Sequence, residues 1–80
     1  MNFMQAEILP NPSLGKLFIC GMQEGTRLTV YNESGEKILP PQLLDNQSVI
    51  DLSEQPEGEY FIELYANRKV DLRKITLKKY

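Results

Sequence analysis

Turn-forming residues interrupt this chain roughly every 8–12 residues, which leaves room for short strands but not for helices of useful length. Between the turns, apolar and polar side chains alternate with the period of two that is typical of a strand. The alternation is clearest at residues 26–31, where the inward side chains are Leu28 and Val30 and the outward ones are Arg27, Thr29 and Tyr31. Short alternating strands separated by frequent turns are typical of an antiparallel sandwich of two sheets. The sequence therefore predicts an all-β fold with about seven strands.

Glycines, prolines and polar residues mark where the expected strands begin and end. The shorter strands are expected at residues 5–9, 16–20, 26–31, 36–39 and 47–52. Gly35 supplies the positive φ of a hairpin loop at residues 32–35. Pro40 and Pro41 are expected to end the strand before them, and residues 40–46 to form an irregular crossover between the sheets.

Residues 56–80 read as two longer strands joined by a polar turn at residues 66–69, where Asn tolerates the left-handed backbone conformation. In the first strand Tyr60, Ile62 and Leu64 share one face, and Phe61 and Tyr65 share the other. In the second strand Val70 and Leu72 share one face, whereas Ile75 and Leu77 share the other. The charged pair Arg73-Lys74 stands where the phase changes, so we expect a bulge there, because one extra residue flips the side chains that follow. The alternative is a central strand that is covered on both faces.

A local pattern before the first of these strands sharpens the fold prediction. Leu52, Pro56, Gly58 and Tyr60 stand in the order L-x-x-x-P-x-G-x-Y. In immunoglobulin-like sandwiches, a tyrosine after such a corner donates its hydroxyl proton to the backbone a few residues upstream. The pattern favours an immunoglobulin-like antiparallel β-sandwich; the simpler interpretation of Tyr60 is an inward aromatic residue whose hydroxyl has found a partner.

The composition excludes most catalytic chemistry. The chain has no histidine, which removes the commonest general base, the commonest metal ligand and every Ser-His or Cys-His nucleophile. The single cysteine, Cys20, cannot form an internal disulfide or a cysteine-rich metal site, and we expect it in the packed core. A net charge of −2 argues against nucleic acid as a partner. We therefore expect no enzyme activity, no catalytic residue, no cofactor and no metal.

Three carboxylates, Glu54, Glu57 and Glu59, cluster near one turn, and Asp45 and Asp51 lie close by in sequence. A catalytic carboxylate pair needs a cleft and partial desolvation, which a polar loop on so small a domain does not supply. We interpret them as solvated surface charges. No apolar run approaches the roughly 18–20 residues that cross a bilayer, and the first residues lack the features of a signal peptide.

Basic residues crowd the C-terminal hairpin, and these are Arg68, Lys69, Arg73, Lys74, Lys78 and Lys79. They have two interpretations. Lysines on an exposed edge strand discourage pairing with other chains. Alternatively, they form a charged docking feature at the end of the chain.

Four motifs, in this order, resemble those of a known family. They are PNPSLGKLFI from Pro10, LTVYNESGEK from Leu28, LSEQPEGEYFI from Leu52 and KITLK from Lys74. Together they are similar to the type A C-terminal sorting domain of cargo proteins of the type IX secretion system of certain Gram-negative bacteria. Glu33 departs from the pattern, because the family commonly has Asp or another small polar residue in that turn.

The resemblance implies a non-catalytic secretion signal, with residues 7–80 as the sorting domain and residues 1–6 as a linker or a remnant of excision. It implies a parent cargo domain on the N-terminal side, and passage through the periplasm to the outer membrane surface. The partners that it implies are secretion-machinery proteins of the outer membrane, namely a shuttle and a sortase-like peptidase that cleaves the domain on anchoring. An accessory or adhesive β-sandwich that binds carbohydrate or protein is the alternative, with Tyr31, Phe61 and Tyr65 as its candidate platform.

The resemblance also assigns roles to particular residues. It assigns recognition by the secretion machinery to Lys74, Ile75, Leu77 and Lys78. It assigns a role in maintaining the fold to Pro10, Asn11, Pro12, Gly15, Gly35, Gly58 and Tyr60.

Overall fold

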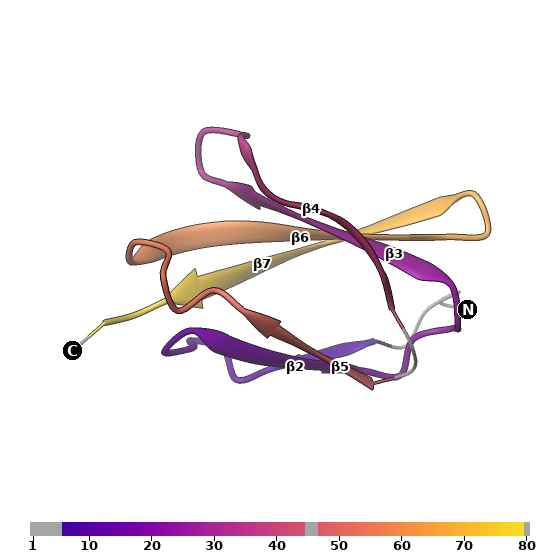
Figure 1. The fold of residues 1–80 in the computed structure, drawn as a ribbon, viewed down its shortest axis with the longest axis horizontal. Coiled ribbons are helices and arrows are strands. Elements are labelled where there is room, and N and C mark those ends of the chain that lie inside the picture. Colours follow the sequence, from indigo (N-terminus) through magenta and orange to yellow (C-terminus); the bar gives the residue numbers. More distant parts are fainter. Residues whose placement is uncertain (1–5, 45–46, 80) are drawn as a thin grey trace.

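The computed structural model describes residues 6–44 and 47–79, which form seven strands in two antiparallel sheets that face each other (Figure 1). The three-stranded sheet has the order β1 (Glu7–Leu9), β2 (Lys16–Cys20), β5 (Gln47–Asp51). The four-stranded sheet has the order β4 (Lys37–Leu44), β3 (Thr26–Asn32), β6 (Gly58–Ala66), β7 (Lys69–Leu77). The predicted all-β sandwich is confirmed.

The core lies between the two sheets and is built from alternate residues of the strands. Its most deeply buried apolar side chains are Leu17, Ile19, Leu28, Val30, Leu52, Ile62, Leu64 and Leu77. Burying one such side chain contributes about 1.5–3 kcal/mol relative to leaving it exposed. The period of two in β2, β3 and β6 is therefore the pattern that joins the two sheets.

The predicted tyrosine corner is present. The Tyr60 hydroxyl donates a hydrogen bond of 2.6 Å to the Pro56 carbonyl, at the point where the chain passes from β5 in one sheet to β6 in the other. Near the opposite end of the chain, Ser13 forms a parallel bridge to Leu77 of β7. Both features fit an immunoglobulin-like sandwich.

The predicted hairpin turns are also confirmed. Gly35 has φ of +83° between β3 and β4, and Asn67 and Arg68 have φ of +52° and +63° between β6 and β7. Two successive residues with positive φ make the two-residue turn that suits the twist of a hairpin.

The predicted end of the fourth strand at Pro40 is wrong, because β4 continues through Pro40 and Pro41 to Leu44. Within the described residues β4 pairs with β3 alone and lies at the edge of its sheet, where a missing N–H costs little. Its register shifts twice along β3, between Leu28 and Val30 and between Val30 and Tyr31. The predicted crossover at residues 40–46 is therefore wrong for residues 40–44, and residues 45–46 lie outside the described part.

The predicted bulge in the last strand is also wrong. β7 pairs with β6 in an unbroken register from Lys69 to Leu77. The phase changes because the inward positions at the start of β7 are occupied by Asp71 and Arg73, which form an ion pair of 2.7 Å. Val70 and Leu72 lie on the outer face and are 56% and 59% exposed. The alternative, a central strand covered on both faces, is excluded by the same exposure.

Two smaller expectations differ from the structure. The alternation predicts that Thr29 faces solvent, but Thr29 is buried in β3, which lies between β4 and β6 and has a register shift to β4 at this residue. Cys20 was expected in the core, but it is half-buried at the end of β2, on the face opposite Ile19.

Candidate recognition site on the last strand

The structure separates the four residues expected to carry recognition into two pairs. Lys74 and Lys78 are exposed, and Lys74 forms a surface ion pair of 3.2 Å with Glu59 of β6. Ile75 and Leu77 are only 2% and 0% exposed, because they belong to the core. A partner that meets the folded domain can therefore contact the lysines but not the two apolar side chains.

The main chain beside these lysines is covered by a segment from the start of the chain. The Ser13 N–H donates to the Thr76 carbonyl and the Lys78 N–H donates to the Ser13 carbonyl, both at 2.8 Å. The Asn11 side chain accepts a 3.0 Å hydrogen bond from the Thr76 N–H, and its amide donates over 3.5 Å to the Lys74 carbonyl. Residues 11–13 thus cap the outer edge of β7 over residues 74–78.

The same outer edge is open nearer the turn. Val70 and Leu72 have the same strand parity as Lys74 and Thr76, so their main-chain groups also point away from β6. Within the described residues, no strand or bridge is paired with β7 at these two positions. The candidate recognition site is therefore a sheet edge that is open at residues 70–72 and capped at residues 74–78.

The capping segment is held in place by Ser13, which sequence reasoning missed. The Ser13 hydroxyl is buried, donates to the Lys16 carbonyl at 2.7 Å and accepts the Gly15 N–H at 3.0 Å. Gly15 itself has φ of +147°, and a Cβ there would lie 2.8 Å from the Ser53 Cα. The spacing P-N-P-S-x-G was the available signal, because a small hydroxyl residue before a glycine is typical of a turn. Both X-Pro bonds, Leu9-Pro10 and Asn11-Pro12, are cis.

Glu33, which departs from the family pattern, has a contact of its own. Its carboxylate accepts the Glu59 N–H at 2.8 Å and lies beside Gly58, which has φ of +150°. The Glu33 side chain therefore pairs with the first residues of β6 across 26 positions of sequence. Burial of the Tyr60 hydroxyl raises its pKa, and the nearby charge of Glu33 raises it further.

The carboxylates near the corner behave as surface charges where the structure describes them. Asp51, Glu54, Glu57 and Glu59 are exposed, whereas Asp45 lies outside the described part. Hydrogen bonds from the side chain and main chain of Ser53 lower the pKa of Asp51. Glu57 accepts the Lys79 N–H at 2.8 Å, so it helps to hold the end of the last strand.

Among residues 6–44 and 47–79, no three His, Cys, Asp or Glu side chains are placed to hold a metal ion, and no helix there is long and apolar enough to span a membrane.

The aromatic residues named for the adhesive alternative do share one surface. Tyr31, Phe61 and Tyr65 lie on the outer face of the four-stranded sheet, where Tyr31 is the cross-strand partner of Phe61. Tyr31 and Phe61, together with Leu72, line a shallow pocket of about 370 Å³. This pocket is partly acidic, because Glu33 and Glu63 also line it.

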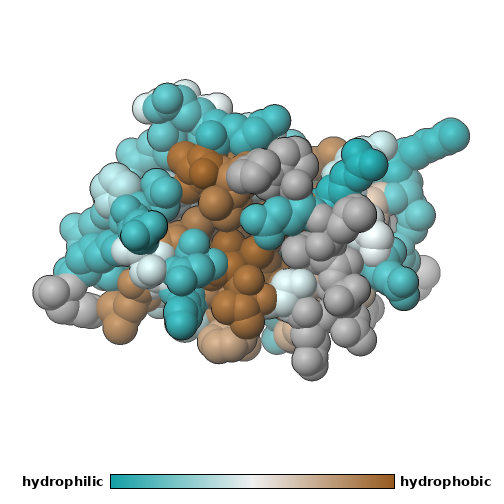
Figure 2. Space-filling view, in the orientation of Figure 1, coloured by the Kyte–Doolittle hydropathy of each residue, from teal (hydrophilic) through white to brown (hydrophobic). Residues whose placement is uncertain are grey.

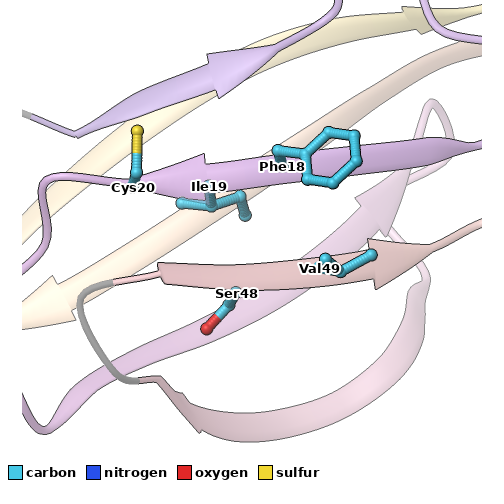
Figure 3. A pocket seen from close by; sticks show the side chains of 5 residues that line it. All are labelled: Phe18, Ile19, Cys20, Ser48 and Val49. Atoms are coloured by element: carbon cyan, nitrogen blue, oxygen red, sulfur yellow. The ribbon is translucent and has the colours of Figure 1, made fainter.

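A second apolar row crosses the outer face of the three-stranded sheet. Leu9, Phe18 and Val49 are cross-strand neighbours on β1, β2 and β5, and each is about half exposed. Figure 3 shows Phe18 and Val49 side by side on adjacent strands, with the Cys20 thiol further along β2. A depression of about 490 Å³ lies over them. On the side of the molecule seen in Figure 2, apolar atoms are visible in the middle of the view, with hydrophilic residues on both sides.

The chain is a small immunoglobulin-like module whose accessible features are a sheet edge, surface lysines and shallow apolar faces. It belongs to the family of secretion system C-terminal sorting domains, whose model matches residues 7–78. The resemblance of its motifs to type IX sorting domains is thereby confirmed.

One solved structure with a similar fold comes from the same secretion system. It is PorZ of Porphyromonas gingivalis, described as an essential bacterial surface component of the type IX secretion system. The match has a TM-score of 0.74 at 16% sequence identity and covers 94% of this chain and 12% of PorZ. At this identity the likeness shows the shared fold. No curated protein matches the chain.

Family membership decides between the two functions that the sequence left open. The chain is a C-terminal sorting signal of the type IX secretion pathway rather than an adhesive module. The family implies a non-catalytic role and export to the cell surface or outer membrane.

Proposed function

We propose that residues 7–80 are the sorting domain of a larger cargo precursor and that residues 1–6 belong to the link that joins them. The cargo domain precedes this piece, crosses the periplasm and reaches the outer membrane. There an outer-membrane shuttle recognises the sorting domain, and a sortase-like peptidase removes it as the cargo is anchored. The match to 12% of PorZ, a protein of the same secretion system, supports a place for such a domain within a much longer chain.

The observation that carries this proposal is the position of β7 at the edge of its sheet, with Lys74 and Lys78 exposed. We assign the direct contacts to these two lysines, because both side chains are exposed and the ion pair of Lys74 with Glu59 lies on the surface, where an acidic group of a partner can compete for the ammonium group. Ile75 and Leu77 serve recognition indirectly, since their burial fixes β7 against the core. Pro10, Asn11, Pro12 and Gly15 shape the segment that caps this edge, whereas Gly35, Gly58 and Tyr60 shape the turns and the corner.

The test is export of a reporter fused in front of these residues in a strain with a working type IX system. Replacing Lys74 and Lys78 together with Gln removes both charges but leaves the core intact. A hydrogen bond to a charged group contributes about 1.5–3 kcal/mol, so losing even one should reduce recognition, and with it surface display, by roughly tenfold or more. Lys16→Gln with Lys37→Gln is the matched control, because these exposed lysines lie on β2 and β4. Equal display of both double variants would reject the role of the β7 lysines.

A further inference from the structure

The cap on the outer edge of β7 is an incomplete strand. Only Ser13 pairs through its main chain, whereas Asn11 uses its side chain to accept the Thr76 N–H. Pro10 and Pro12 have no N–H and cannot donate at all. The cap therefore satisfies the edge with two main-chain and two side-chain hydrogen bonds, one of which is as long as 3.5 Å. Each contributes only about 0.5–1.5 kcal/mol net, so an extended strand that offers a regular ladder could replace them.

A second group of contacts holds the start of the same segment. The Arg73 guanidinium donates at 2.9 Å to the Ala6 carbonyl and is itself held by Asp71 through two hydrogen bonds of 2.7 and 2.9 Å. The segment at residues 6–13 thus touches β7 at both of its ends. Between them, β1 is only three residues long and pairs with β2 at the edge of the other sheet. Short edge elements of this kind open more readily than the core.

The uncapped part of the edge adjoins the capped part without a break. Val70 and Leu72 lie on the same strand, four and two positions before Lys74, and their side chains are more than half exposed. Figure 1 shows that the turn of the β6–β7 hairpin forms one end of the molecule, so this part of the edge is reached from outside the sandwich. An incoming strand has main-chain groups to pair with here before any capping bond is broken.

We propose that the outer edge of β7 is a strand-acceptor site that the chain's own residues 11–13 occupy until a partner replaces them. The occupant is an extended segment of the recognising protein, paired through its main chain and bearing acidic side chains near Lys74 and Lys78. It pairs first at Val70 and Leu72 and then displaces Asn11 and Ser13 along residues 74–78. This mechanism rests on the proposed function, because it names how β7 is recognised. Its consequence is that recognition frees residues 11–13 from β7, in the segment that leads to the cargo.

One arm of the test uses the purified chain and needs no secretion machinery. Asn11→Ala removes both side-chain bonds of the cap, so hydrogen exchange of the Thr76 amide should rise by about tenfold, while the amides of β3 and β6 that pair with each other stay protected. Ser34→Ala, in the exposed β3–β4 loop, is the control and should change neither the exchange of the Thr76 amide nor that of the β3 and β6 amides. The uncapped edge should also make Asn11→Ala self-associate in sedimentation experiments. Unchanged Thr76 exchange in a folded, monomeric Asn11→Ala chain would overturn the strand-acceptor site.

The other arm uses Leu72, whose N–H points away from β6. Leu72→Pro deletes that donor without removing a bond to β6, because proline is tolerated on the outer side of an edge strand. Leu72→Ala is the matched control, since it removes the same exposed side chain and keeps the N–H. We expect Leu72→Pro to lose most reporter export, while Leu72→Ala keeps it and both purified chains stay folded. Equal export of the two folded variants would overturn strand addition at this edge.

Failure of the unsubstituted chain to be exported would instead contradict the proposed function. The experiment on the purified chain would then decide whether the outer edge of β7 is a strand-acceptor site.

Discussion

At the scale of the residue, single side chains hold the places where the chain changes sheet. Tyr60 fastens the corner before β6 through one hydrogen bond, and Ser13 fastens the turn before β2 through two. Each polar group is buried or half-buried, and among the described side chains no buried nitrogen or oxygen lacks a partner. Such groups are costly to lose, because the partner that is left behind stays desolvated.

Tyr60→Phe tests the corner directly. The substitution removes the hydroxyl and leaves the Pro56 carbonyl without this donor, so the free energy of unfolding should fall by about 1–2 kcal/mol. Denaturation by urea measures this loss as a lower midpoint. Tyr65→Phe is the control, because Tyr65 lies on the same strand and is 41% exposed; its midpoint should be unchanged. Equal midpoints for the two variants would contradict the role of the corner.

The corner also makes a prediction about pH. The folded protein raises the pKa of the Tyr60 hydroxyl above its ordinary value of 10.0, chiefly by burial. The stability that comes from the neutral hydroxyl is therefore fully present below pH 10 and is lost as the pH rises through the folded pKa. The stability difference between the native chain and Tyr60→Phe should accordingly shrink above pH 10, measured by urea denaturation at several pH values. A difference that grows with alkaline pH would contradict this assignment.

At the scale of the element, the two halves of β7 differ in the side chains that they turn inward. Its second half faces the core with Ile75 and Leu77, whereas its first half faces inward with Asp71 and Arg73. The two inward charges neutralise each other through an ion pair of 2.7 Å. The Asp71–Arg73 pair thus closes that end of the sandwich while the outer edge beside it stays open.

Arg73→Gln should destabilise the domain more than the loss of a surface ion pair. It removes the hydrogen bonds to Asp71 and shortens the reach to the Ala6 carbonyl, so the free energy of unfolding should fall by about 1–3 kcal/mol. Lys74→Gln breaks an exposed pair with Glu59 and should cost about 0–1 kcal/mol. Guanidinium or urea denaturation compares the two. If Lys74→Gln cost as much as Arg73→Gln, the inward pair would have no special part in closing the sandwich.

At the scale of the whole molecule, the two ends of the described chain are joined to each other. Asn11 and Ser13 contact residues of β7 that lie more than 60 positions away, and Arg73 reaches Ala6. The first and last motifs of the family pattern therefore form one structural unit. A change at either end alters the surface at the other.

This arrangement makes truncation a test of folding as much as of recognition. Deleting residues 74–80 removes Ile75 and Leu77 from the core and takes away the partners of the Asn11 side chain and of the Ser13 main chain. Losing two such buried side chains costs about 4–10 kcal/mol, which is comparable to the whole stability of a small domain. The truncated chain should be unfolded by circular dichroism and by the dispersion of its amide NMR signals. A folded truncated chain would contradict the placement of these residues in the core.

Local patterns of the sequence were enough for the strands, the turns and the corner. The alternation in β2, β3 and β6, the positive φ at Gly35 and the hydroxyl bond of Tyr60 all depend on residues close together in the chain. The four motifs likewise identified the family. Only the tertiary structure showed that β4 runs through two prolines, that β7 has no bulge, and that Ile75 and Leu77 are hidden from a partner. The physical reason is that a residue's neighbours in sequence set its strand and its face, whereas the position of a strand in its sheet, and the partner at its edge, depend on residues brought together from the far ends of the chain.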